Sequence, residues 1–382
     1  EINLIKILEV SYADKENKSQ LIDRMANVIS VLNKCEHNFI FIVRGRQDKV
    51  VLYFGISRIF GKMTLTQEIG DLLQSAVRAN FPGVLLSPVA VEENKKVLND
   101  LLTFKYYSSI TGVPTTSIPP EEGENSRKSI GKQGYLAGLE YIVNALEGRE
   151  DVLAVIANPI SQERLRSEMS GVSNVISEIH HKVKWTEGEE ESKQHQSSAG
   201  KSRTHSGSII VYSYSRSKQF TEMTGTATGS SQNYEVKDRA LEYFEDVLEA
   251  HLDRLKKATG IGGWETSIIL GSKDQSIQLA LEGVVQGAMS GEHSYVWPIR
   301  SLRLETEIAH DYLFNCSSLQ QGNLVSIGES AYPLNLFQPF NTLLTTKELA
   351  TITCLPTEEV WGVNSRQIAW FGLNEGDKEG IA

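Results

Sequence analysis

Residues 39–56, FIFIVRGRQDKVVLYFGI, decide the fold class, because they have the pattern of a β-hairpin. The two arms, 39–43 and 50–56, are rich in β-branched and aromatic residues, which favour strands. The polar residues 44–49 between them include Gly45 and supply the turn. Antiparallel strands that alternate with amphipathic helices are typical of sheets covered by helices. This alternation predicts an α+β protein.

The segments on either side of this hairpin extend the pattern. Residues 2–10 read as a buried strand, and a helix that follows carries apolar residues at helical spacing. After the hairpin, Thr64 or Thr66 is placed to cap a helix that runs to about Ala79, and Pro82 with Gly83 stops it. The first part of the chain thus reads as one α/β unit.

A second unit looks like a variation on the first. A strand is predicted at 151–157 and a helix at 161–184. Residues 186–234 are rich in Ser, Thr, Gly and Gln, as a flexible linker is, and the helix–strand–helix pattern resumes at Val236. The linker therefore interrupts an α/β unit.

These patterns predict an α+β protein with two mixed α/β sandwich-like units, whose similarity suggests an internal duplication. The expected units are residues 1–128 and residues 129–300, the latter with a flexible insert at about 186–234. Residues 301–382 are poorer in helix and richer in Gly, Pro and short apolar runs, which predicts a small β-rich connecting region.

Composition and charge restrict the classes of function. Of the 382 residues, 40% are hydrophobic and 23% are charged, as in ordinary globular domains. The formal net charge of -10 argues against a broad basic face for DNA or RNA. The cysteines Cys35, Cys316 and Cys354 have no metal-ligand spacing and suit a reducing compartment. With no long apolar segment and no signal-peptide pattern, we expect a cytoplasmic protein without a membrane segment.

One tripeptide, Gly200-Lys201-Ser202, matches the end of a phosphate-binding loop. The complete loop begins with a glycine, which lets backbone N–H groups surround phosphates, but His195 stands at that position. The loop must also follow a buried strand, whereas this tripeptide follows the charged residues 187–193. We interpret it as part of the linker and not as a nucleotide site.

Other candidate residues are also explained without catalysis. His180, His181, His195 and His205 lack companion ligands at metal spacing. His251 falls on the apolar stripe of its helix and is interpreted as a core or rim residue. The pairs Glu121-Glu122 and Glu358-Glu359 read as solvated loop charge. The loop at 112–132 is either a crossover linker or a partner contact. The sequence therefore predicts no catalytic, cofactor-binding or metal-binding residue.

Two longer stretches resemble the region that precedes the motor core in bacterial HerA-type ATPases, relatives of the FtsK translocases and conjugation ATPases. The first is SIGKQGYLAGLEYIVNALEGREDVLAVIANPIS, residues 129–161, and the second is NTLLTTKELATITCLPTEEVWGVNSRQIAWFGLNEG, residues 341–376. Ala157-Asn158-Pro159 matches the family's A-[ED]-P turn, except that Asn158 replaces the commoner acid. Residues 344–350 match L-[ST]-[ST]-x-E-L-A, and Leu355-Pro356 through Gly362-Val363 matches the segment that follows it.

The resemblance implies an accessory and assembly region of a ring-forming, hexameric, ATP-dependent DNA translocase or helicase. Such motors act in DNA processing, in conjugation-like transfer or in phage defence. The family's P-loop and Walker B acid follow the matched segments, so the resemblance places ATP and Mg²⁺ in a longer protein and none in this chain. It also implies a homo-oligomeric ring through that core, DNA contact only through the motor, and an effector or nuclease partner.

Two further hypotheses remain open. The acidic composition and the flexible insert also suit a stand-alone protein-binding module without catalytic activity. A small-molecule enzyme of another type is the third, because the pockets of α/β domains are not visible in a sequence.

Overall fold

The computed structural model of the chain describes most of its residues. The described ranges are 2–13, 18–35, 37–57, 66–115, 138–185, 239–291, 297–315, 324–327, 330–333, 340–356, 360 and 362–368. The chain forms two compact units. We call Glu1–Arg166, Arg254–Gln321 and Leu336–Ala382 the sheet unit, and Ser167–Asp253 with Gly322–Asn335 the insert unit.

The sheet unit begins with the βαββαβ order of a ferredoxin-like fold. The elements are β1 (Ile2–Ala13), α1 (Lys18–Lys34), β2 (Asn38–Gly45), β3 (Val50–Ser57), α2 (Thr66–Asn80) and β4 (Leu85–Pro88), followed by α3 (Val91–Leu101). Strand β1 lies between β3 and β4, and β3 pairs with β2, all antiparallel. The resulting order β4-β1-β3-β2 is the order that this fold requires, and the predicted hairpin forms its β2 and β3.

The same order of elements then repeats. The second set is β5 (Tyr106–Thr111), α4 (Gly138–Ala145), β6 (Val152–Ile160), β7 (Gly263–Ser272), α8 (Gln275–Met289) and β8 (Arg300–Leu304), followed by α9 (Thr306–Asn315). Strand β5 lies between β7 and β8, and β7 pairs with β6, again antiparallel. The α+β class is confirmed, and the repeated topology supports the internal duplication that the sequence suggests.

The two repeats form one continuous sheet. Strand β2 pairs antiparallel with β6, from Phe39 opposite Ala157 to Arg44 opposite Val152. The second repeat begins at Tyr106, so the expected boundary near residue 128 falls inside it rather than between the repeats. The polar β5 sequence YYSSIT lacks the apolar alternation that would reveal a strand.

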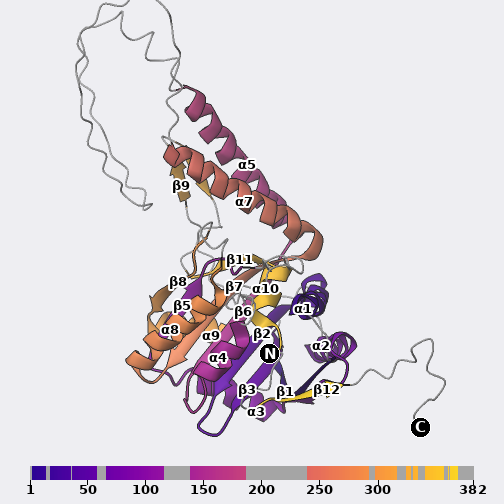
Figure 1. The fold of residues 1–382 in the computed structure, drawn as a ribbon. Helices are drawn as coiled ribbons and strands as arrows, with labels where there is room; N and C mark the ends of the chain where they lie inside the picture. Colours follow the sequence, from indigo (N-terminus) through magenta and orange to yellow (C-terminus); the bar gives the residue numbers. More distant parts are fainter. Residues whose placement is uncertain are drawn as a thin grey trace, which may run out of the picture. The chain divides into compact units, whose positions relative to one another are not determined.

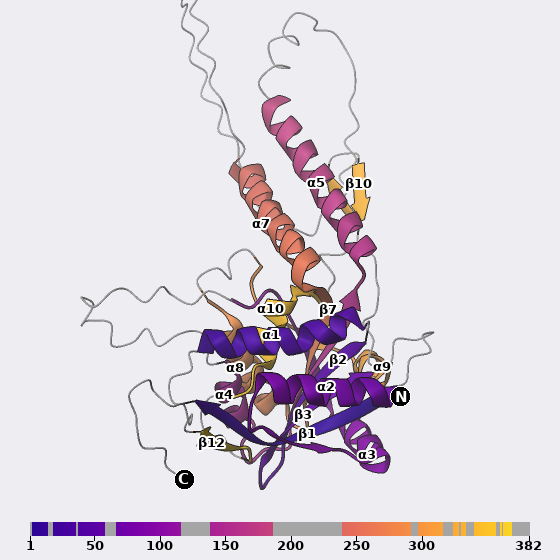
Figure 2. The same ribbon diagram turned by 90° about the vertical axis from the view of Figure 1, so that its right-hand side faces the viewer.

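Helices cover both faces of this sheet (Figures 1 and 2). Helices α1, α2, α4 and α8 pack on what we call the first face, with Phe39, Phe41 and Val43 of β2. Helices α3 and α9 pack on the second face, with Ile40 and Ile42. Because successive side chains alternate between two covered faces, every residue of β2 is buried. This double cover explains why the central strands are apolar throughout.

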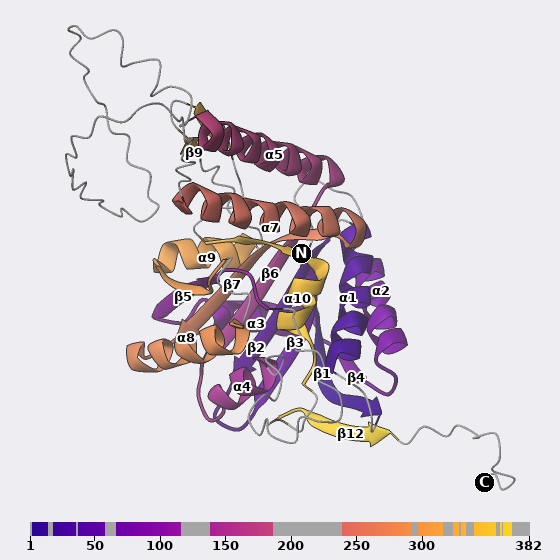
Figure 3. The same ribbon diagram turned by 45° about the horizontal axis from the view of Figure 1, so that its top comes forward.

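The C-terminal residues 340–368, which we call the strap, add to both repeats. Strand β11 (Thr342–Thr345) pairs with the start of β7, and β12 (Asn364–Ile368) pairs parallel with the end of β1 (Figure 3). Between them, α10 (Thr346–Thr353) contacts α1 and α4. Strands β8, β11 and β12 all belong to the main sheet.

The insert unit contains most of α5 (Gln162–Trp185) and α7 (Arg239–Ile261). The two helices lie side by side in all three views, and His180 Nδ1 lies 3.2 Å from Glu245 Oε1. Val172, Val175, Ile179 and Leu248 are fully buried. Strands β9 (Leu324–Ile327) and β10 (Ser330–Pro333) form a separate antiparallel pair.

Two glycines of the sheet unit provide a test of how its strap and helices pack. Gly362 has a φ of 93°, and a Cβ there would collide with the backbone of Val50. We expect Gly362→Ala to lower the free energy of unfolding by about 1–3 kcal/mol. Gly283 lies in α8 with open space around its Cα, so Gly283→Ala should raise that free energy by about 0.5–1 kcal/mol. Urea unfolding measures both, and shifts of the same sign would contradict this packing.

Candidate functional site

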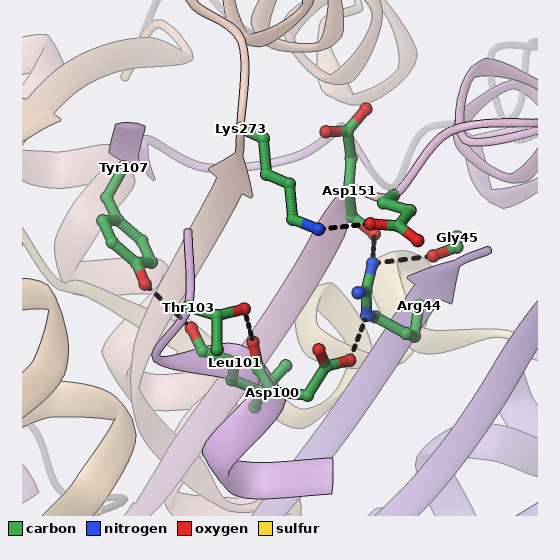
Figure 4. A network of polar contacts seen from close by, with 9 residues as sticks. Arg44, Gly45, Asp100, Leu101, Thr103, Tyr107, Asp151 and Lys273 are labelled. Carbon is green, nitrogen blue, oxygen red and sulfur yellow. Dashed lines mark hydrogen bonds and ion pairs between the residues drawn. The ribbon is translucent and has the colours of Figure 1, made fainter. Parts of the chain in front are cut away.

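A buried arginine connects the two repeats on the second face of the sheet. Arg44 ends the apolar part of β2 and is only 4% exposed. Its Nε donates to Asp100 Oδ2 of α3 at 2.8 Å (Figure 4). Its Nη1 donates to the backbone oxygens of Gly45 at 2.7 Å and of Asp151 at 3.1 Å. The guanidinium also lies 4.9 Å from the ring centre of Phe104. One charged group thus joins β2, α3 and the start of β6.

Further polar contacts surround Arg44. Tyr107 donates to the backbone oxygen of Leu101 at 2.9 Å, and burial raises the pKa of its hydroxyl to about 12. Thr103 donates to the backbone oxygen of Asp100 at 2.7 Å. At the edge of the network, Lys273 forms an ion pair with Glu150 (Figure 4). The hydrogen bonds of Thr103 and Tyr107 close the turn between α3 and β5. They therefore set the path of the chain from the first repeat to the second.

Asp151 is the most buried acid of this network, at 3% exposed. Burial raises the pKa of its carboxyl, against hydrogen bonding from Ser272 and the positive charges of Arg149 and Arg44. Arg44 binds the backbone oxygen of Asp151, and the carboxylate points away from it (Figure 4). The contacts of Asp151 join the start of β6 to Arg44 and Gly45 of β2 and to Ser272 at the end of β7.

A second polar group lies on the same face, near the point where the insert leaves the sheet. Glu265 of β7 is 4% exposed, and its Oε2 accepts from Arg164 Nη1 of α5 at 3.0 Å. Asn158 of β6 lies directly opposite Glu265 in the ladder. Two residues along β7, Ser267 donates to Asn341 Oδ1 at 2.5 Å. The first turn of α5 is therefore held to the sheet by a partly buried ion pair.

The end of α7 is held in a similar way by the strap. Arg254 binds both carboxylate oxygens of Glu348, at 2.7 and 2.8 Å, and donates to the backbone oxygen of Leu343 at 2.6 Å. Glu348 also accepts from the backbone N–H of Thr345, whose side chain accepts from that of Glu348, a capping box. Bidentate pairs of this kind are strong and directional. The first turn of α5 and the C-terminal part of α7 are thus both anchored within the sheet unit.

Thr346 completes this junction. Its hydroxyl oxygen accepts from Trp264 Nε1 at 3.0 Å and lies 2.7 Å from the backbone oxygen of Ile261. Three polar residues of the motif at 344–350 therefore have structural roles: Thr345 caps α10, Thr346 binds the start of β7, and Glu348 binds Arg254.

The candidates considered from sequence do not form one site. His180 lies beside Glu245 in the insert unit, and His251 is 2% exposed, as its apolar stripe predicted. Gly112 has a φ of 119°, and its N–H donates to Thr342 of the strap. Cys35 and Cys354 are half-buried. Outside the described residues lie Gly200 to Ser202, His195, His205, Glu121, Glu122, Glu358, Glu359, Cys316 and the rest of the loop at 112–132, and nothing is described of the His181 side chain.

Sequence reasoning missed Arg44, Asp151, Glu265 and Arg254. Arg44 and Glu265 each interrupt an apolar strand, which is a visible signal, because a buried charge requires a partner. Their partners, however, come from distant parts of the chain, so the pairs themselves were not predictable.

Comparison of the sequence with protein-family models finds no match, and no curated protein is significantly similar to it. Among the described residues, no three His, Cys, Asp or Glu side chains gather as a metal site would require. No helix in the described part of the chain has the length and apolar character needed to cross a membrane.

The Arg44 network gives a direct test of how the repeats are joined. Arg44→Met keeps most of the side-chain volume but removes the donor to Asp100 and to the backbone oxygen of Gly45. The backbone oxygen of Asp151 loses one of its two donors and keeps the N–H of Gly45. We expect a loss of about 2–4 kcal/mol in the free energy of unfolding. As a control, Lys95→Met removes an exposed ion pair with Glu92 and should cost less than about 0.5 kcal/mol. Equal effects of the two substitutions in urea unfolding would contradict a joining role for Arg44.

Proposed function

We propose that this chain is an assembly and docking region of a ring-forming, ATP-dependent DNA translocase of the HerA and FtsK type. The proposal rests first on the two stretches that resemble this group. In the structure, Asn158 lies within the central sheet, and Thr345 and Thr346 bind the strap to the start of β7. Glu348 binds Arg254 of α7. The matched residues thus have roles in one folded body, which is what a shared structural module would need.

The observation that carries the docking role is the unequal size of two equivalent turns. In the first repeat, β2 and β3 are joined by residues 46–49 alone. In the second repeat, the equivalent strands β6 and β7 are separated by residues 161–262, which include α5 and α7. A ferredoxin-like repeat closes without this insert, so the fold does not require it. Additions at surface turns commonly carry recognition.

The structure around the insert suits such a role. Within the sheet unit, the ion pairs Arg164–Glu265 and Arg254–Glu348 fix the first turn of α5 and the C-terminal part of α7. Within the insert unit, α5 and α7 bury an apolar face of their own. A docking element built on helices with fixed ends loses less conformational entropy on binding than a free loop does. We infer that the insert presents a protein surface to an effector, such as a nuclease.

In this proposal the chemistry belongs to a motor core that follows the matched segments. ATP and Mg²⁺ act there, the ring closes there through head-to-tail contacts, and DNA is contacted there. In this proposal the present chain binds the effector and holds it beside the motor. We propose no cofactor for it. The second candidate is a stand-alone protein-binding module, which the same insert favours.

Two measurements separate these candidates. We expect the reading frame that encodes this chain to continue into G-x-x-x-x-G-K-[ST] between a strand and a helix, and its full product to hydrolyse ATP faster with DNA. The second measurement uses a variant of that full-length product in which residues 161–262 are replaced by the four-residue turn 46–49. We expect DNA-stimulated ATP hydrolysis to persist and effector capture to be lost.

A reading frame without a P-loop would overturn the motor assignment and leave the binding module. Effector capture that survives removal of the insert would overturn the docking role of the insert, whatever the motor does.

A further inference from the structure

We propose that Asp151 makes the junction between the two repeats sensitive to protons, so that protonation of its carboxyl group tightens the junction. The junction is the pairing of β2 with β6, and Asp151 lies directly before β6, where this pairing ends. The backbone oxygen of Asp151 accepts from the N–H of Gly45 at 2.9 Å and from Arg44 Nη1 at 3.1 Å. A change at Asp151 therefore acts directly on the contact between the repeats.

The surroundings of the carboxyl group disfavour its charged form. Asp151 is 3% exposed, and its Oδ2 is buried with no hydrogen-bond partner among the described residues. An unpartnered buried oxygen costs more free energy when it is charged than when it is neutral. The guanidinium of Arg44 binds the backbone oxygen, and the carboxyl group points away from it (Figure 4). The position of this group thus favours a neutral carboxyl.

The hydrogen bonds of Ser272 favour the same form. The Ser272 side chain is in hydrogen-bond contact with the Asp151 carboxyl group. Its Oγ also donates to the backbone oxygen of Asp274 at 3.0 Å and accepts from the N–H of Asp274 at 3.2 Å. A hydroxyl has one proton to donate, so a charged Asp151 competes with that backbone oxygen for it. A protonated Asp151 instead donates to Ser272 Oγ, and Ser272 keeps its bond to Asp274.

Charged groups on the neighbouring elements act on Asp151 in both directions. They are Arg44 with its partner Asp100, Arg149 before β6, the pair Glu150 and Lys273, and Asp274 at the start of α8. Burial is the largest effect and raises the pKa of the Asp151 carboxyl, while Ser272, Arg149 and Arg44 oppose the rise and Asp274 adds to it. The adjacent Glu150 carboxyl shifts the other way, because hydrogen bonding from Lys273 and its positive charge lower the pKa.

The two neighbouring acids therefore respond to pH with opposite signs. A raised pKa in the folded state means that the folded protein binds the proton more tightly than the unfolded chain does. For Asp151, this stabilisation is fully present below the ordinary pKa of 3.8 and is lost as the pH rises through the raised value. Mild acid thus tightens the end of the β2–β6 pairing through Asp151. This inference goes beyond the proposed function and does not depend on a motor core.

Hydrogen exchange of the full chain tests this at the Gly45 amide, which makes the contact. Asp151→Asn keeps the shape of a protonated carboxyl group and has no charge. The Gly45 protection factor of this variant should exceed that of the wild type at least about 5-fold at about pH 7.5, and the ratio should fall toward one at about pH 5.

Glu150→Gln is the matched control, because it removes a charge from the adjacent, more exposed residue. Its ratio to the wild type should not exceed one at any pH, since the lowered pKa of Glu150 makes its charge stabilising. An equal gain in both variants would assign the effect to the overall negative charge and would overturn the proposal.

A titration of the wild-type carboxyl groups by NMR makes the test independent of how well the variant folds. An Asp151 carboxyl that titrates at or below 3.8 would overturn the proposal. A ratio for Asp151→Asn that stays constant with pH, or that does not exceed one near neutral pH, would also overturn it. Neither result would bear on whether a P-loop follows in the reading frame.

Discussion

The antiparallel pairing of β2 with β6 is the interaction on which the rest of this structure depends. Each ferredoxin-like repeat has β2 or its equivalent at an edge, and an edge of unpaired backbone groups is prone to wrong pairing. Joining the two edges removes both and places the most apolar strands in the centre of one sheet. Arg44 strengthens the junction between β2 and β6, because it binds Asp100 of the first repeat and the backbone of Asp151 at the start of β6.

The remaining parts follow from this central pairing. Because both repeats share one sheet, the helices that follow β4 and β8 pass over its second face and cover it. The strap then adds β11 to the second repeat and β12 to the first, so a single C-terminal segment binds both. The insert interrupts only the turn between β6 and β7, and ion pairs on both sides anchor its ends. We propose that the insert, residues 161–262, serves recognition.

Several of these features could be predicted from the sequence. The hairpin at 39–56 and the helices have strong periodic signals, and the α+β class follows from them. The linker predicted at 186–234 lies outside the described residues. Strand β5 was missed, because its serines face polar partners such as Gln278 and the backbone of Phe340 instead of an apolar core. The pairs of Arg44 and Arg254 depend on contacts between distant segments, which one sequence does not reveal. The motif at 344–350 was noticed as a resemblance, and the structure gives its threonines and Glu348 a physical role in anchoring the strap.

The central claim is that the two repeats form one cooperative body through β2 and β6. Native-state hydrogen exchange of the full chain tests it most directly, because it reports the free energy of opening at each backbone amide. The account predicts that amides of β2 and β6 exchange with the same high free energy of opening and respond equally to denaturant. Exchange of β6 through a much less costly opening, while β2 stays protected, would contradict it.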